Sequence, residues 1–184
     1  RLIAIDSSEA RAGRLLDLLP RNNMEFVPRR RNDIDFIFLI ANPRQGRQIK
    51  PTLAFYFAGD LPVYSLPSIY DGQDNQSENN DLNGIVFADA PWMLQESEEL
   101  RLEMDTNLRQ VQGQLQRLRA MGVDSFRLYP RLQQFYNQGV KSMQGSTGKL
   151  SMSKDQRIQR TLDLAQFENG FAREYRKERN SSSN

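Results

Sequence analysis

Three polar residues each stand at the end of an apolar segment of the chain. They are, with the segment that each one closes, Asn42 (residues 34–41), Ser65 (residues 61–65) and Asp89 (residues 84–88). If these segments are parallel strands, their ends lie together at one rim, which is where open α/β sheets bind ligands. Asn42 also precedes Pro43, a pair typical of a helix N-terminus, whose free N–H groups attract anions. This arrangement would suit a binding cleft, but helix caps and turns explain the same residues more simply.

The residues that the chain lacks restrict its chemistry further. It contains no histidine and no cysteine. Cys-His and Ser-His-Asp catalysis, thiolate or imidazole zinc sites and disulfide bonds are therefore excluded. Acidic residues number 23, but none shows the apolar setting and defined separation of a tuned acid–base pair. The sequence gives no indication of catalysis.

Two short motifs imitate binding loops. Residues 145–150, GSTGKL, look like a phosphate loop, which also needs an earlier glycine, Ser or Thr after the lysine, and a helix next. Position 143 is Met143, position 150 is Leu150, and a strand is expected to follow. Residues 79–84, NNDLNG, imitate a calcium loop, but its twelfth position would be Ala90 where a bidentate Glu is required. We interpret both as turns and expect no cofactor and no metal.

Two features of the sequence could contact a partner. Arg29, Arg30 and Arg31 could form an anion site at the sheet edge, although a solvated turn is the simpler interpretation. Trp92 follows a predicted strand end and could anchor a partner, since tryptophan is enriched at interaction hot spots; core packing explains it equally well. The balance of 25 basic and 23 acidic residues leaves a net charge of +2, which argues against binding nucleic acid.

The elements that would position these residues are those of an α/β fold. Residues 34–41 are apolar at nearly every position, the pattern of a parallel strand that is buried on both faces. A helix that begins at Pro43 and is interrupted at Pro51 would connect it to the strand of residues 61–65. The result is a βαβ unit with parallel strands. Residues 84–88 supply a third strand.

The remaining elements are predicted from periodicity and from turn residues. In chain order, they are a helix after Ser7 and Ser8 that stops at Pro20, a short strand at residues 25–27, an exposed loop at residues 71–83, a helix at residues 96–121 that stops at Gly122, a helix capped by Asp124 and bent at Pro130, and a hairpin around residues 154–156. Residues 1–172 would form one domain and residues 173–184 a flexible, charged and Ser-rich tail. The chain begins without Met and has no apolar stretch of about 18 residues. We expect a mature or excised fragment of a larger protein.

Four stretches of the sequence occur together in an order typical of one family. They are residues 33–51 (DIDFIFLIANPRQGRQIKP), 61–70 (LPVYSLPSIY), 81–93 (DLNGIVFADAPWM) and 144–152 (QGSTGKLSM). They resemble the C-terminal domain of the LpoA family, outer-membrane lipoproteins that activate a class A penicillin-binding protein. The resemblance covers roughly residues 1–170. It implies an α/β fold with a mostly parallel sheet and flanking helices, as one lobe, plus part of the crossover, of a type I periplasmic-binding-protein-like fold.

The resemblance also implies a function. The chain would be a non-catalytic regulator that binds a class A penicillin-binding protein, which is a peptidoglycan synthase, and shifts it toward an active state. It would lie in the periplasm, tethered to the outer membrane by a lipid anchor outside this chain. The alternative is a solute-binding lobe that captures a small polar ligand through Asn42, Ser65, Ser68, Tyr70 and Asp89. An enzyme of flavodoxin-like or nucleotide-binding type is the weakest hypothesis, because no phosphate loop is present.

Overall fold

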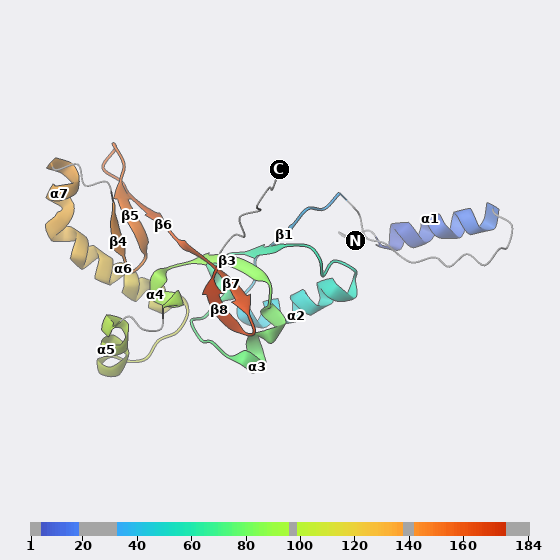
Figure 1. Cartoon of the computed structure of the whole chain (residues 1–184), viewed down its shortest axis with the longest axis horizontal. Helices are drawn as coiled ribbons and strands as arrows, with labels where there is room; N and C mark the ends of the chain where they lie inside the picture. The colour runs from blue at the N-terminus through green and yellow to red at the C-terminus, as the bar shows by residue number, and fades with distance from the viewer. Residues whose placement is uncertain (1–4, 19–32, 96–98, 138–141, 176–184) are drawn as a thin grey trace, which may run out of the picture.

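The computed structural model of the chain describes residues 5–18, 33–95, 99–137 and 142–175. It contains a five-stranded sheet of order β1-β2-β3-β7-β8 and a three-stranded sheet of order β4-β5-β6 (Figure 1). The elements, in chain order, are α1 (Ile5–Leu18), β1 (Ile37–Leu39), α2 (Pro43–Phe55), β2 (Val63–Ser65), η1 (Pro67–Ile69), α3 (Gln76–Asn79), η2 (Asn80–Leu82), β3 (Ile85–Asp89), α4 (Pro91–Leu94), α5 (Glu99–Asn107), α6 (Gln114–Leu128), η3 (Tyr129–Arg131), α7 (Leu132–Asn137), β4 (Met143–Gly145), β5 (Gly148–Met152), β6 (Ile158–Thr161), β7 (Asp163–Glu168) and β8 (Phe171–Glu174).

The strands β1, β2 and β3 are parallel neighbours, as the sequence predicts. Leu39 pairs with Ser65, and Ser65 pairs with Phe87, so the carboxyl ends of the strands meet at one rim. On the other side of β3, β7 and β8 join the sheet in antiparallel fashion. The predicted α/β class with a parallel group of strands is confirmed.

The helix α2 begins where the sequence predicts. The Asn42 side chain accepts a hydrogen bond from the Gln45 N–H at 2.9 Å, and Gln45 Oε1 accepts one from the Asn42 N–H at 3.1 Å. This capping box satisfies two N–H groups that a helix end leaves free. The predicted interruption at Pro51 is wrong, because α2 continues through it to Phe55. Pro51 is exposed, so the loss of one internal hydrogen bond is offset by water.

Gly46 allows α2 to lie close to the elements beside it. A Cβ atom at this position would lie 2.5 Å from Ile69 Cδ1 and 2.9 Å from Leu82 Cδ2. Both of these side chains are completely buried. Leu82 belongs to the segment 71–83, which the sequence interprets as an exposed loop, and that interpretation is wrong. The segment has few apolar residues, and its composition therefore predicts a loop. It nevertheless forms two short helical turns, α3 and η2, that place one apolar side chain in the core.

The predicted single helix of residues 96–121 is also wrong. α5 ends at Asn107, and α6 begins at Gln114 and continues through Gly122. Gly113 has a φ of +57°, a conformation that glycine adopts without strain, and it separates the two helices. Asp124 does not cap a new helix but lies inside α6, buried. Pro130 marks the change from α6 to the 3₁₀ turn η3, at the predicted place.

The C-terminal half contains the predicted hairpin, since β5 and β6 pair in antiparallel fashion on either side of residues 154–156. The predicted tail boundary after residue 172 is wrong, because Arg173 and Glu174 pair with β7 as part of β8. The predicted strand at residues 25–27 lies outside the described residues. None of the helices in the described ranges is long and apolar enough to cross a membrane.

The strand β1 differs from its prediction in one respect. Leu39 is buried in the hydrophobic core, but Phe36, Phe38 and Ile40 are 57%, 54% and 72% exposed. The sequence predicts burial on both faces. In the described part of the chain only one face of β1 is covered, and β1 is an edge strand of its sheet.

Candidate functional site

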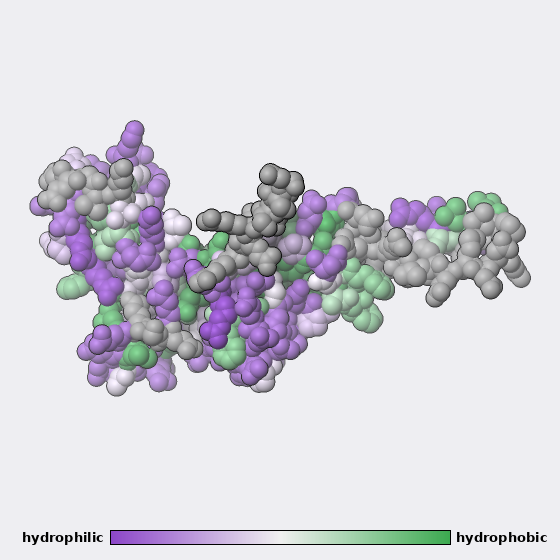
Figure 2. Space-filling model, in the orientation of Figure 1, coloured by the Kyte–Doolittle hydropathy of each residue, from purple (hydrophilic) through white to green (hydrophobic). Residues whose placement is uncertain are grey.

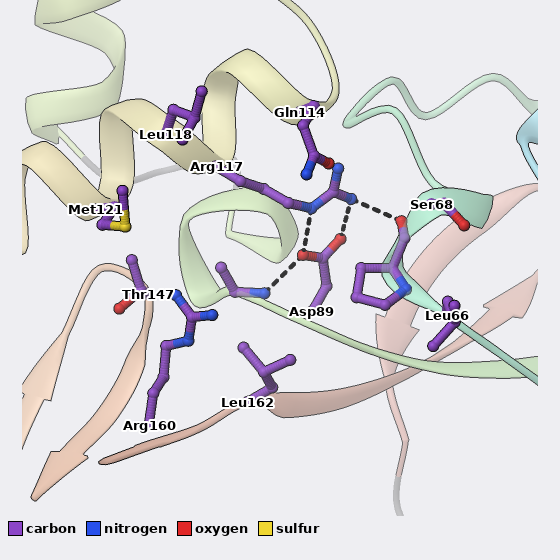
Figure 3. Close-up of a pocket in the computed structure, with 12 residues that line it drawn as sticks. Leu66, Ser68, Asp89, Gln114, Arg117, Leu118, Met121, Thr147, Arg160 and Leu162 are labelled. Atoms are coloured by element: carbon purple, nitrogen blue, oxygen red, sulfur yellow. Dashed lines mark hydrogen bonds and ion pairs between the residues drawn. The ribbon is translucent and has the colours of Figure 1, made fainter. Parts of the chain in front are cut away.

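The rim at the carboxyl ends of β2 and β3 is closed by one arginine from α6. Arg117 Nε donates to Asp89 Oδ1 at 2.8 Å, and Arg117 Nη2 donates to Asp89 Oδ2 at 2.5 Å. The same Nη2 donates to the carbonyl oxygens of Pro67 at 2.7 Å and Tyr70 at 2.8 Å. Figure 3 shows the guanidinium reaching from α6 across to the end of β3. The contacts hold α6 against the rim of the sheet.

A cavity of about 370 Å³ lies beside this ion pair. Its wall is mainly apolar, with polar groups from β6, α6 and the β4–β5 turn (Figure 3). The lining residues are Leu66, Pro67, Ser68, Asp89, Ala90, Gln114, Arg117, Leu118, Met121, Thr147, Arg160 and Leu162. Arg117 is committed to Asp89, whereas no partner of the Arg160 side chain is found among the described residues. The cavity therefore offers one cation among apolar side chains, and it brings together no nucleophile and base.

A second buried carboxylate organises the motif that imitates a phosphate loop. Asp124 Oδ1 accepts the Ser146 N–H at 2.7 Å, and Oδ2 accepts the Thr147 N–H at 2.7 Å and the Thr147 hydroxyl at 2.6 Å. A phosphate loop offers such N–H groups to its ligand. Here a carboxylate of the same chain occupies them, and the glycines shape the turn between β4 and β5. The interpretation of residues 145–150 as a turn is confirmed.

The structure uses the predicted cleft residues for internal hydrogen bonds. Ser65 is buried and its hydroxyl donates to the Leu39 carbonyl at 2.8 Å, while the Ser68 hydroxyl donates to the Ala41 carbonyl at 2.9 Å. The Tyr70 hydroxyl donates to Asp74 Oδ1 at 3.0 Å. Of the candidates, Ser68 and Asp89 line the cavity, and Asn42, Ser65 and Tyr70 do not.

Trp92, predicted as a possible partner anchor, is core. Its side chain is 0% exposed, and its Nε1–H donates to Gln116 Oε1 at 2.9 Å. Arg101 Nη1 donates to the Trp92 carbonyl at 2.8 Å. Trp92 is therefore not an exposed anchor. Its large apolar ring stabilises the fold because it is removed from water between α4 and α6. Arg29, Arg30 and Arg31, the other predicted contact, lie outside the described residues.

Sequence reasoning missed the residue that closes the rim, Arg117. The available signal was its spacing with Ala120 and Asp124, three and seven positions further along the chain, which puts all three on one side of a helix. Ala120 and Asp124 are buried and Arg117 bonds to Asp89, so this side of α6 is the side that packs against the rest of the chain. Thr147 and Arg160 have no such signal, because they reach the cavity only through the folding of the second sheet.

The pKa of one carboxylate near the rim is shifted. Asp163 of β7 pairs with Asp89 of β3 in the sheet register. Burial, and secondly the negative charge of Glu174, raise the pKa of Asp163 above its ordinary value. The charged form of Asp163 is therefore disfavoured in the folded chain.

Comparison with known proteins agrees with the fold. A family model described as LppC lipoprotein matches residues 1–170. Among similar proteins, the penicillin-binding protein activator LpoA of Vibrio antiquarius is 26% identical over 165 residues, which are 90% of this chain and 27% of that protein. LpoA of Aliivibrio fischeri is 27% identical over 168 residues, which are 89% of this chain and 27% of that protein. The chain thus spans about a quarter of the length of these relatives.

Solved structures share the architecture. The C-domain of LpoA from Haemophilus influenzae, described as a regulator of PBP1A, has a TM-score of 0.66 at 19% identity, covering 90% of this chain and 49% of that one. A protein from Chromobacterium violaceum described as a branched-chain amino acid ABC transporter has a TM-score of 0.55 at 25% identity, covering 89% and 52%. The predicted likeness to a periplasmic-binding-protein-like fold is confirmed by these neighbours. With the family model matching most of its length, the chain belongs to the LppC lipoprotein family.

Proposed function

We propose that this chain is a non-catalytic part of an activator of a class A penicillin-binding protein. The proposal is supported by relatives described as penicillin-binding protein activators and by a structural neighbour described as a regulator of PBP1A. In this proposal the intact protein works in the periplasm and is tethered to the outer membrane by a lipid anchor outside this chain. The description of the matching family as lipoproteins supports that location.

One observation favours contact with a partner over capture of a solute. The polar side chains at the rim already bond within the chain: Asp89 to Arg117, Ser65 to the Leu39 carbonyl and Ser68 to the Ala41 carbonyl. A ligand that used these groups would have to break existing hydrogen bonds, each of which costs free energy when left unmade. The rim therefore fixes the shape of the surface around it. A fixed surface suits docking, because little ordering is needed on binding.

Docking activates the synthase only if it distinguishes two states of that enzyme. The activator shifts the population by as much as its affinity differs between the inactive and the active state. No chemistry from this chain is required. A coupling of 1–3 kcal/mol, typical of such systems, corresponds to about 5–150-fold.

The test is an activity measurement on a purified class A penicillin-binding protein from the same organism. The rate of glycan polymerisation and cross-linking is followed as the intact protein is added, and a saturable increase is expected. The variant in which Arg29, Arg30 and Arg31 are all changed to Ala tests the proposed contact, with Arg131→Ala as the matched control. Circular dichroism establishes that each variant is folded.

The outcomes separate the two parts of the proposal. An unchanged synthase rate at saturating protein would overturn the activator function. A normal increase with the triple Arg variant would keep the function and discard the Arg29–Arg31 contact. A calorimetric titration with free amino acids and soluble muropeptides addresses the solute-binding alternative, which a micromolar dissociation constant would favour.

A further inference from the structure

The charges of the chain are divided between two segments. Residues 61–108 contain ten acidic residues and one basic residue, Arg101, whereas residues 109–161 contain ten basic residues and two acidic ones, Asp124 and Asp155. The net charge is therefore −9 in the first segment and +8 in the second, although it is only +2 for the whole chain. A surface rich in one sign of charge attracts partners that carry the opposite sign. The second segment therefore favours contact with an acidic partner.

The fold keeps the two segments on different sides of the molecule. The acidic segment includes α3 and α5, which lie at the lower side of Figure 1, and the basic segment includes the β5–β6 hairpin, whose tip lies at the upper side. Where the segments meet, their charges pair, since Arg117 bonds to Asp89 and Arg119 bonds to Asp105. The hairpin tip lies away from this boundary, so its charges are open to a partner.

The tip of the hairpin, residues 153–157, is basic. Lys154 and Arg157 are exposed, and neither side chain forms an ion pair with another residue in the described ranges. Asp155 lies between them in the sequence and is the one acidic residue of the tip. Asp124, the other acidic residue of the segment, is buried and accepts the Thr147 hydroxyl at 2.6 Å. Figure 2 shows the upper end of the hairpin as hydrophilic surface, so the tip offers two cations to a partner.

An apolar cavity opens beside the tip. It has a volume of about 310 Å³, lies between α7 and the hairpin, and is lined by Leu132, Gln133, Tyr136, Met152 and Gln156. Tyr136 is 67% exposed and Leu132 is 40% exposed. The volume is at the small end of the range for ligand pockets, which suits a single large side chain. Tyrosine and methionine are also among the residue types that are enriched at protein interfaces.

We propose that the hairpin tip and this cavity, together called the hairpin surface, dock on an acidic surface of the class A penicillin-binding protein, which inserts an apolar side chain into the cavity. This contact rests on the proposed function and is separate from that of Arg29–Arg31. Carboxylates of the partner pair with Lys154 and Arg157, and Gln133 and Gln156 of the cavity wall offer amide hydrogen bonds. The acidic segment of the chain repels the same partner surface, so the two charged segments together set the orientation of docking.

The combination of cations and an apolar cavity favours a protein over a charged polymer or a membrane surface. A polymer of carboxylates or an anionic lipid headgroup uses the cations alone and leaves the cavity empty, whereas a folded partner fills such a pocket with an anchor side chain. In protein complexes, charges at the edge of an interface mainly set the association rate, and buried anchors mainly set the dissociation rate. The hairpin surface therefore predicts a different kinetic effect for each of its two parts.

The first experiment changes the charges of the tip. Association of the intact protein with an immobilised class A penicillin-binding protein from the same organism is measured at low and at high salt. At low salt the double variant Lys154→Glu, Arg157→Glu is expected to associate about tenfold more slowly, and Asp155→Lys about threefold faster. Both differences should shrink at high salt, which screens the charges. The control, Arg44→Glu with Lys50→Glu, changes the net charge by the same amount on α2, and its association rate should stay within about twofold of wild type.

The second experiment changes the cavity. Tyr136→Ala removes the aromatic wall, so the complex is expected to dissociate about tenfold faster, with little change in its association rate. Tyr129→Ala is the matched control, because Tyr129 is 81% exposed and does not line the cavity. Circular dichroism establishes that each variant is folded.

The outcomes separate this contact from the proposed function. Wild-type protein that neither binds nor stimulates the synthase would overturn both. Wild-type protein that does both, while the tip and cavity variants keep its rate constants, would overturn the hairpin surface alone. In that case, loss of binding to peptidoglycan or to anionic lipid vesicles by the tip variant would name the occupant instead. Equal slowing by the α2 control would assign the effect to net charge and would also overturn the hairpin surface.

Discussion

The rim of the sheet differs from the exposed side of β1 and β2, which carries Phe38 and Tyr64 and is called the bare face here, in how far the chain satisfies its own groups. At the rim, the carboxylate of Asp89 is 1% exposed and bonded to Arg117, and nearby hydroxyls donate to backbone carbonyls. On the bare face, Phe38 and Tyr64 are large apolar side chains that water still reaches. The rim carries the kinds of residue that bind solutes, and the bare face carries the kinds that bind protein.

The contrast teaches that polar residue types at a strand end do not by themselves indicate a ligand. Each must be counted with its existing partners, because a group that is already bonded gains little from a new one. Because its polar groups are already bonded, the rim is a structural contact that holds α6 against the sheet, called the clasp below. The bare face, whose burial would be favourable at about 25 cal/mol per Å², has the greater capacity to bind.

The largest effect is expected from breaking the clasp. Arg117→Ala leaves the buried carboxylate of Asp89 without its cation, and the carbonyls of Pro67 and Tyr70 without a donor. Removal of one partner from a buried ion pair costs about 3–5 kcal/mol. Urea unfolding should show this loss in the free energy of unfolding, while Arg131→Ala, on an exposed turn, changes it by less than about 0.5 kcal/mol. A stability equal to that of wild type would mean that the rim is not a clasp.

Two adjacent residues of β1 compare the two faces directly. Leu39→Ala opens a cavity on the packed face and should cost about 2–4 kcal/mol of unfolding free energy. Phe38→Ala removes a larger side chain from the bare face. It should cost less than about 1 kcal/mol, because water already reaches the ring. Equal losses for the two substitutions would contradict the contrast between the faces.

A smaller effect separates structural from functional use of a rim hydroxyl. Ser65→Ala deletes the donor to the Leu39 carbonyl and should lower the free energy of unfolding by about 1 kcal/mol. Stimulation of the penicillin-binding protein by the intact variant should remain at the wild-type level. Loss of stimulation in a variant that is folded under the assay conditions would show that the hydroxyl has a functional contact.

The smallest effect concerns Asp163. Its folded pKa is raised by burial and by Glu174, so the folded chain holds this proton more tightly than the unfolded chain. The resulting cost to stability is absent at pH values below the unfolded pKa and develops as pH rises through the folded pKa. Asp163→Asn removes the cost and should stabilise the chain at pH 7 by less than about 1 kcal/mol, since the group is partly exposed. The gain should shrink toward pH 4, as urea unfolding at both pH values would reveal; a constant gain would exclude this cause.

The parts of the fold that follow from local patterns could be predicted from sequence. The apolar strands, the Asn42 cap and the β5–β6 hairpin depend on neighbouring residues, and each is present. The break between α5 and α6 could not be anticipated, because the leucine periodicity continues across it, although α5 ends at Asn107 and Gly113 precedes the start of α6. The prediction of the rim was incomplete for a similar reason. Asp89 can be identified from its position after a strand, but its partner Arg117 is 28 residues away in the sequence. Pairings of that kind depend on the assembled fold.

The central claim is that the chain works through its surface and that its rim binds no solute. It is tested most directly by the rate of a purified class A penicillin-binding protein during titration with the intact protein, with and without saturating free amino acids or muropeptides. Solute effects on the synthase alone are subtracted. The account predicts a saturable increase that the solutes do not change. An increase that appears only when a solute is present would contradict it.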